Sequence, residues 1–225
     1  MAALFCALAI ASTFIMHIKV MFLTFDAKDA VITIAGLLFG PIYSIGISLV
    51  VSLIEFISIG DAGPWGFLMD FLSTAIFSTT CALIYKYKKN LKGAIIGLAS
   101  SSLAMTAFML LFNLFIVPLY TPNYTTAAVA KMVPTLFLPF NLTKAILNAA
   151  IVLILYKPAS TAMKAAKVLP SSGLSRNADS NMTPEQRRRK NLTFSLIITA
   201  TGLVIAALCF VVFFVFLGGS ITFWE

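Results

Sequence analysis

The sequence predicts an all-α integral membrane protein, built as a bundle of six helices with one additional helix after it. Three observations favour this class. Hydrophobic residues make up 60% of the 225 residues and charged residues only 11%, whereas a soluble domain typically carries about 25% charge. The apolar segments are long and continuous, unlike the short alternating strands of an outer-membrane barrel. The basic residues gather in polar stretches between these segments.

Four helices are predicted in the first part of the chain, at about 2–18, 30–39, 42–59 and 67–85. A more polar stretch at 19–29, which we expect to be a loop, separates the first two. The pair Gly40-Pro41 separates the second from the third, because proline cannot continue a preceding helix. The loop GDAGPWG leads into the fourth helix.

Two further helices, at about 93–117 and 134–156, complete a six-helix membrane domain over residues 1–157. A loop rich in Pro, Tyr and Thr joins them at 118–132. A basic linker, rich in Ser and Asn, is predicted at 158–191. Residues 192–225 are predicted to form an extra transmembrane helix, at about 192–217, with a short tail.

The net charge of +8 comes mainly from two clusters that flank predicted helices. They consist of Lys86, Lys88, Lys89 and Lys92, and of Lys157, Lys164, Lys167, Arg176 and the run 187–190. Such clusters mark cytoplasmic loops under the positive-inside rule. We therefore expect a cytoplasmic N-terminus, an outside C-terminus, contact with lipid, and no nucleic-acid partner.

Three polar side chains inside apolar helices indicate a binding site in the membrane. They are Asn113 in FNLFIVPLY and Asn141 and Lys144 in LPFNLTK. A charged side chain at the bilayer centre costs about 2.5–3.5 kcal/mol on insertion scales, so it usually faces a cavity or a partner. Asn141 and Lys144 share one helix face, where they could present amide groups and a cation to a planar polar ligand. The alternatives are an interhelical hydrogen bond for each asparagine, and an ion pair of Lys144 with Asp70 or Glu55.

Together with the turn in GLLFGPI, the motifs FNLFIVPLY and LPFNLTKAILN resemble the S components of energy-coupling factor (ECF) vitamin transporters, most closely the riboflavin-binding members. The resemblance covers about residues 2–157. It implies a bacterial plasma-membrane subunit that captures a vitamin from outside and is not itself an enzyme. A membrane scaffold subunit and two ATPase subunits would supply the energy, and riboflavin would be cargo rather than a cofactor.

The resemblance also implies the site residues. Asn113, Asn141 and Lys144 would contact the isoalloxazine ring, and the stretch 22–29, with Phe25 and Asp29, would close over the ligand. Asp70 stands where the family would have an asparagine, a departure that could alter the choice of ligand. No metal ligand is expected.

Small residues recur every fourth position on the first helix, at Ala3, Ala7 and Ala11. This spacing lets another helix approach closely. The resemblance implies that the scaffold docks there, and the alternative is ordinary packing within the bundle. The helix at 192–217 has no counterpart in a six-helix S component.

Three other functions compete with this one. The same fold could carry a different vitamin or precursor. An ion-coupled secondary transporter would normally show inverted repeats, and none is visible in this sequence. An intramembrane enzyme would need a nucleophile with a base or clustered metal ligands, and the sequence has one histidine and no H-E-x-x-H motif. No G-x-x-x-x-G-K-[ST] motif is present, so a partner must supply energy from ATP.

Overall fold

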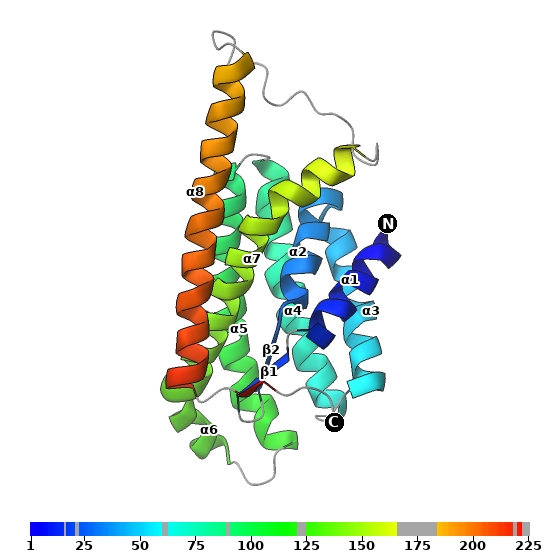
Figure 1. Ribbon diagram of the computed structural model, residues 1–225. Coiled ribbons are helices and arrows are strands. Elements are labelled where there is room, and N and C mark those ends of the chain that lie inside the picture. The colour runs from blue at the N-terminus through cyan, green and yellow to red at the C-terminus, as the bar shows by residue number, and fades with distance from the viewer. Residues whose placement is uncertain are drawn as a thin grey trace.

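The computed structural model describes residues 1–15, 17–20, 23–59, 63–88, 91–120, 125–165, 184–217 and 220–221. Long helices lie side by side, and a small sheet lies near one end of the bundle (Figure 1). The elements in chain order are α1 (Ala2–Ile15), β1 (His17–Val20), β2 (Leu23–Asp26), α2 (Lys28–Phe39), α3 (Pro41–Ile59), α4 (Gly63–Tyr87), α5 (Leu91–Tyr120), α6 (Thr126–Met132), the π-helix η1 (Val133–Phe137), α7 (Leu138–Ala165), α8 (Pro184–Val211), the π-helix η2 (Val212–Phe216) and β3 (Ser220–Ile221).

The predicted all-α membrane class is confirmed. Within the described part of the chain, five helical runs are long and apolar enough to cross a membrane, and they comprise α3, α4, α5, the run α6–η1–α7, and the run α8–η2. By contrast, α1 has 14 residues and α2 has 12, fewer than the roughly 20 that a full span needs. The count of spanning helices by length is therefore lower than the predicted six plus one.

The short helix α2 is the centre of the fold. It packs against α1, α3, α4 and α7 (Figure 1), and most of its residues are buried. Gly36 lets it lie this close, because a Cβ there would come within 3.0 Å of Ser44 and 3.2 Å of Ala82. Gly40 has a φ of 105°, which glycine adopts readily, and Pro41 starts α3. The predicted break between the second and third helices is thus confirmed.

The stretch after the first helix is a pair of strands, where we expected a loop. The first helix ends at Ile15 rather than near residue 18, and β1 pairs with β2 in antiparallel register from His17–Asp26 to Val20–Leu23. Apolar and polar residues alternate in HIKV and in LTFD, which is the period of a strand. The strand β3, from the end of the chain, joins the other side of β1.

Other boundaries also differ from the sequence-based ones. The short helix α6 lies within the predicted loop 118–132, and Thr125 caps it by accepting a hydrogen bond from the Ala128 N–H at 3.3 Å. The helix α7 continues through Pro158 to Ala165, and α8 begins at Pro184. Both helices cross the predicted domain limits at 157/158 and 191/192.

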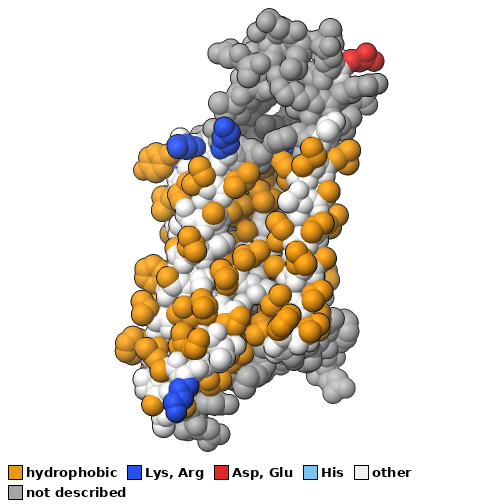
Figure 2. All heavy atoms as spheres, turned by 90° about the vertical axis from the view of Figure 1, so that its left-hand side faces the viewer, with side chains coloured by type: hydrophobic (Ala, Val, Ile, Leu, Met, Phe, Trp, Pro, Cys, Tyr) orange, Lys and Arg blue, Asp and Glu red, His pale blue; other side chains and the backbone are white. Residues whose placement is uncertain are grey.

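The outer surface of the bundle is apolar. Figure 2 shows one face covered by hydrophobic side chains, with the coloured Lys and Arg side chains near its two ends. On α5, α8 and η2, this exposed set includes Leu103, Phe115, Leu196, Leu208 and Phe216. A contiguous exposed apolar surface of this extent is the surface of a protein in lipid.

Candidate functional site

The first part of the site is the inner face of α7. Asn141, Lys144 and Asn148 follow one another at intervals of three and four residues, so they lie on the same side of the helix, and all three are buried. The Lys144 ammonium lies 3.7 Å from Asp29 Oδ2 and 3.9 Å from Asp26 Oδ2. It also donates to the Thr24 carbonyl at 3.4 Å. Lys144 therefore holds β2 and the start of α2 against α7.

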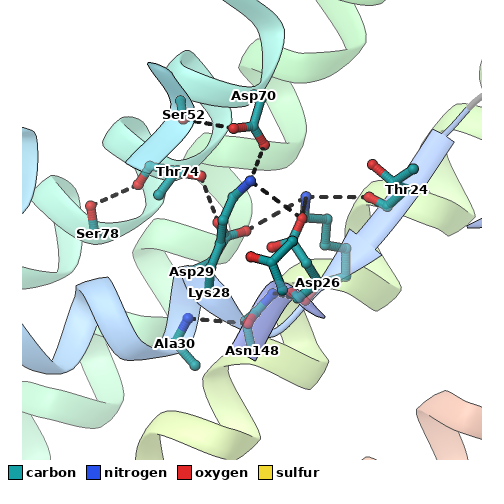
Figure 3. A network of polar contacts seen from close by, with 12 residues as sticks. Thr24, Asp26, Lys28, Asp29, Ala30, Ser52, Asp70, Thr74, Ser78 and Asn148 are labelled. Atoms are coloured by element: carbon teal, nitrogen blue, oxygen red, sulfur yellow. Dashed lines mark hydrogen bonds and ion pairs between the residues drawn. The ribbon is translucent and has the colours of Figure 1, made fainter. Parts of the chain in front are cut away.

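Two of these ion-pair partners differ from our expectation. The alternative interpretation paired Lys144 with Asp70 or Glu55, but a second buried lysine takes both of those carboxylates. Lys28 Nζ lies 2.7 Å from Asp70 Oδ1, contacts the Glu55 carboxylate, and lies 3.5 Å from Asp26 Oδ2. Asp26 is the shared partner of both lysines, and Figure 3 shows it between Lys28 and Asn148.

Together these side chains form a charged cluster, made of Asp26, Lys28, Asp29, Glu55, Asp70 and Lys144. Its members come from β2, α2, α3, α4 and α7. In the ionised state, four carboxylates face two ammonium groups, so the cluster has an excess of negative charge. Burial of charge on this scale requires hydrogen bonds to the remaining lone pairs.

Hydroxyl groups on neighbouring helices supply those hydrogen bonds. Thr74 donates to Asp29 Oδ1 at 2.6 Å, and Ser52 donates to Asp70 Oδ2 at 2.6 Å (Figure 3). Thr13 donates to Glu55 Oε1 at 2.7 Å. Each of these three carboxylates is thus fixed in orientation by a hydroxyl as well as by a lysine, and the cluster has a defined geometry.

Asn148 joins the same cluster to the backbone. Its Oδ1 accepts from the Ala30 N–H at 3.2 Å, which satisfies a donor in the first turn of α2. Its Nδ2 donates to the Asp26 carbonyl at 3.4 Å and to the Lys144 carbonyl at 3.2 Å. The side chain therefore connects β2, α2 and α7 at one point.

The two predicted asparagines are buried but hydrogen-bond locally. Asn113 Nδ2 donates to the Met109 carbonyl at 2.7 Å, and Asn141 Nδ2 donates to the Phe137 carbonyl at 2.8 Å, in each case one turn earlier. Among the described residues, Asn113 Oδ1 is a buried acceptor without a hydrogen-bond partner. The structure therefore does not link these amides to the charged cluster.

Phe25 faces away from the charged cluster. It follows Thr24 and precedes Asp26 in β2, so its side chain lies on the opposite face of the strand. It is fully buried and packs against Phe213 of η2, with ring centroids 5.2 Å apart. Of the predicted site residues, the structure brings together Lys144, Asp29 and Asp70, and it places Phe25 behind them.

The predicted docking residues lie on the outside of the bundle. Ala3, Ala7 and Ala11 are exposed, whereas Phe5, Ala9 and Thr13 are the buried residues of α1. The small residues therefore do not serve the packing of α1 within this chain.

Sequence reasoning missed two residues that matter for the site. Asn148 could have been found, because it lies one turn after Lys144 on the polar face of the same helix. Lys28 carried a weaker signal, namely that the acids Glu55 and Asp70 on apolar helices needed a cation.

Comparison with known proteins gives the family. The profile described as "ECF transporter, substrate-specific component" matches residues 1–156. The chain is 30% identical over 149 residues to the riboflavin transporter RibU of Staphylococcus aureus (strain TCH60), covering 64% of this chain and 78% of that protein. It is 30% identical over 133 residues to the riboflavin transporter FmnP of Bacillus subtilis (strain 168), covering 56% of this chain and 70% of that protein.

The fold agrees with this result. A solved structure, described as the S component of a bacterial ECF transporter, superposes with a TM-score of 0.61 at 29% identity. It covers 72% of this chain, and the chain covers 95% of it. The sequence-based assignment is confirmed: this chain belongs to the substrate-specific components of ECF transporters.

Proposed function

We propose that this protein captures riboflavin from outside the cell and delivers it for uptake with a scaffold subunit and two ATPase subunits. The observation that carries the proposal is the buried polar face of α7, with Asn141, Lys144 and Asn148 in line. The likeness to two riboflavin transporters supports the choice of ligand.

The chemistry of the face suits a flavin. The isoalloxazine ring presents carbonyl and ring-nitrogen acceptors and one imide N–H, which an ammonium group and carboxamides can match. The ribityl chain presents hydroxyl groups, which can donate hydrogen bonds to carboxylates such as those of Asp29 and Asp70. We therefore assign Lys144, Asn141 and Asn113 to the ring and Asp29 and Asp70 to the ribityl chain, while Phe25 supports β2 from the side that faces away from the ligand.

In the structure, Lys144 is already engaged with Asp26, Asp29 and the Thr24 carbonyl. A ligand that takes hydrogen bonds from Lys144 must therefore exchange with β2 and the start of α2. We infer that the β1–β2 hairpin moves aside on entry and returns over the bound vitamin.

We assign the outside face to the end of the bundle that carries the hairpin and α6. The opposite end carries Lys86 and Lys88 at the exposed end of α4, as expected of a cytoplasmic side. The N-terminus is then cytoplasmic, and the membrane is the bacterial plasma membrane.

The test is riboflavin binding to the purified full-length protein in detergent, measured by quenching of flavin fluorescence. We expect tight binding to the unaltered protein. In Lys144→Met, affinity should fall about tenfold to a hundredfold, since a charge-assisted hydrogen bond contributes about 1.5–3 kcal/mol. The control is Lys86→Met, which changes an exposed lysine and should leave affinity unchanged.

Two results would contradict parts of the proposal. Equal affinity of Lys144→Met and the unaltered protein would remove Lys144 from the site. If the unaltered protein does not quench flavin fluorescence, riboflavin is excluded as the ligand. Other vitamins would then be tested, and Asp70 would be the first residue to substitute.

A further inference from the structure

The helix α8 is held tightly against the family's helical domain. At Gly202 the two backbones come so close that a Cβ would lie 2.6 Å from Ile154 Cγ1 and 3.4 Å from the Ala150 carbonyl oxygen. Elsewhere α8 is largely exposed and apolar, with Leu203, Leu208 and Val211 on the surface. The contact at Gly202 fixes the height and rotation of α8 relative to α7.

One turn of the π-helix η2 then carries an aromatic side chain into the core. Phe213 is fully buried, and its ring packs on Phe140 of α7 at a centroid distance of 5.6 Å and on Phe25 of β2 at 5.2 Å. Leu136, Leu147 and Cys209 complete this apolar cluster. Phe213 is thus the residue through which α8 reaches the β1–β2 hairpin.

The end of the chain contacts the same hairpin a second time. The strand β3 pairs with β1 in antiparallel register, with Ile18 opposite Ile221 and Lys19 opposite Ser220. Since β2 pairs with the other edge of β1, the three strands form one sheet with β1 in the middle and β2 and β3 at its edges. The sheet lies close to the end of α8 in Figure 1.

These contacts place β2 between two layers. Asp26 faces the charged cluster and pairs with Lys28 and Lys144, whereas Phe25 faces α8. If β2 moves away from the cluster, Phe25 must leave its place against Phe213. Because β1 moves with β2, the pairing of β1 with β3 must also break, or β3 must move too. The profile match ends at residue 156, so α8 and β3 lie outside the part of the chain that defines the family.

We propose that α8 and β3 hold the β1–β2 hairpin over the charged cluster, with Phe213 as a positioning residue that limits how fast the hairpin opens. The consequence for ligand exchange rests on the proposed function, because it takes the charged cluster to be the vitamin site. The hold on the hairpin itself does not depend on which ligand binds.

The first test is amide hydrogen exchange of the full-length protein in detergent, without ligand. Phe213→Ala should raise the exchange rate of β2, residues 23–26, by about tenfold, because it removes two aromatic contacts. The matched control is Phe216→Ala in the same π-helix, whose side chain is 79% exposed and which should leave the exchange of β2 unchanged. Equal exchange in both variants would overturn the proposal.

The second test joins the two strands. Ile18→Cys with Ile221→Cys places two cysteines at directly opposed positions of the β1–β3 pair in the full-length chain. In riboflavin stopped-flow measurements, oxidation should slow association and dissociation at least about tenfold, and reduction should restore both. Each single-cysteine variant, treated with the same oxidant, is the control. In the reduced background, Phe213→Ala should speed dissociation while Phe216→Ala does not.

The two proposals fail in different ways. Suppose that the β2 amides exchange faster in Phe213→Ala but riboflavin does not bind the unaltered protein. The proposal that α8 holds the hairpin is then supported, and the proposal that riboflavin is the ligand is contradicted. Suppose instead that riboflavin binds, but that neither Phe213→Ala nor the disulfide changes the amide exchange of β2 or the rates of ligand binding and release. The proposal that α8 holds the hairpin is then contradicted, and riboflavin remains the proposed ligand.

Discussion

Lys28 is the residue on which the charged cluster most depends, because its ammonium group contacts carboxylates of β2, α3 and α4. Asp26, Glu55 and Asp70 come from segments far apart in the sequence and meet at this one nitrogen. The opposite charges stabilise one another here, because little water is present to solvate them. Removing the cation would leave one buried and two half-buried carboxylates close together without their counter-ion, and either they would bind protons or the structure would open around them.

We therefore expect Lys28→Met to destabilise the protein by about 3–5 kcal/mol, the usual cost of breaking a buried ion pair on one side. Thermal unfolding in detergent would measure this as a large drop in the midpoint. Lys86→Met is the control, since that lysine is exposed at the end of α4. Equal midpoints for the two variants would mean that the contacts of Lys28 do not stabilise the fold.

Asn113 gives a prediction of the opposite sign for stability. Its buried Oδ1 has no partner among the described residues, and such a group costs about 1–3 kcal/mol. Asn113→Leu should therefore leave the ligand-free protein at least as stable while weakening riboflavin binding. Asn148→Leu is the comparison, because the Asn148 amide makes hydrogen bonds to Ala30, Asp26 and Lys144, and its loss should lower the unfolding midpoint. Unchanged affinity in Asn113→Leu would exclude Asn113 from the site.

Part of this site could be predicted from the sequence, for a physical reason. Asn141 and Lys144 stand out because polar groups are costly in an apolar helix, wherever the helix packs. The partners of Lys144 could not be predicted, since they depend on how β2 lies across α7. Lys28 was overlooked because it sits in a stretch that reads as a polar loop, and only the tertiary structure turns it inward.

At the scale of elements, the short helix α2 explains why the site can exist. It begins beside the charged cluster at Lys28 and Asp29 and ends at the turn of Gly40. Being buried on nearly all sides, it holds these two charges between α4 and α7. Such a buried helix needs neighbouring helices that pack very close to it. Gly36 permits this, because it has no Cβ to meet Ser44 and Ala82.

Gly36→Ala should thus destabilise the protein by about 1–3 kcal/mol, the typical cost of overpacking. The added methyl group would lie 3.0 Å from Ser44 Cβ and 3.2 Å from Ala82 Cβ, neither of which can rotate away. Gly46→Ala is the control, since a Cβ there has nothing within 4 Å. The measurement is again the thermal midpoint, and a Gly36→Ala protein as stable as Gly46→Ala would contradict the packing.

Helices with long apolar runs were predictable, and the short elements were not. The runs in α3, α4, α5, α7 and α8 are recognisable from hydropathy alone. The strands of four residues and the seven-residue α6 are too short for hydropathy to distinguish them from loops, even though HIKV and LTFD alternate. The C-terminal end of α7 and the beginning of α8 lie in polar sequence, where composition no longer indicates helix length.

At the scale of the whole molecule, the size of the exposed side chains differs from one helix to another. The exposed side chains of α5 and α8 are mostly large and suit lipid, whereas α1 also exposes the small residues Ala3, Ala7 and Ala11, beside Leu4 and Leu8. Small residues at this spacing permit close approach of another helix. We expect this face to meet the scaffold subunit.

Ala7→Trp should therefore abolish riboflavin uptake by cells while leaving riboflavin binding to the purified protein unchanged. The control is Leu103→Trp on α5, a residue that is 68% exposed and that should retain both activities. The measurements are uptake of labelled riboflavin in a strain that depends on this protein, and fluorescence quenching in detergent. Uptake equal to that of the control would place the scaffold elsewhere.

The excess of carboxylates over lysines in the charged cluster bears on which form of a vitamin the protein accepts. A phosphate ester of riboflavin carries up to two negative charges and would enter a region where acidic side chains outnumber lysines by four to two. Like charges about 4–8 Å apart repel by about 2–4 kcal/mol at an intermediate dielectric constant. Selectivity for the uncharged vitamin over its phosphorylated form would then follow from electrostatics, without any steric barrier to the phosphate.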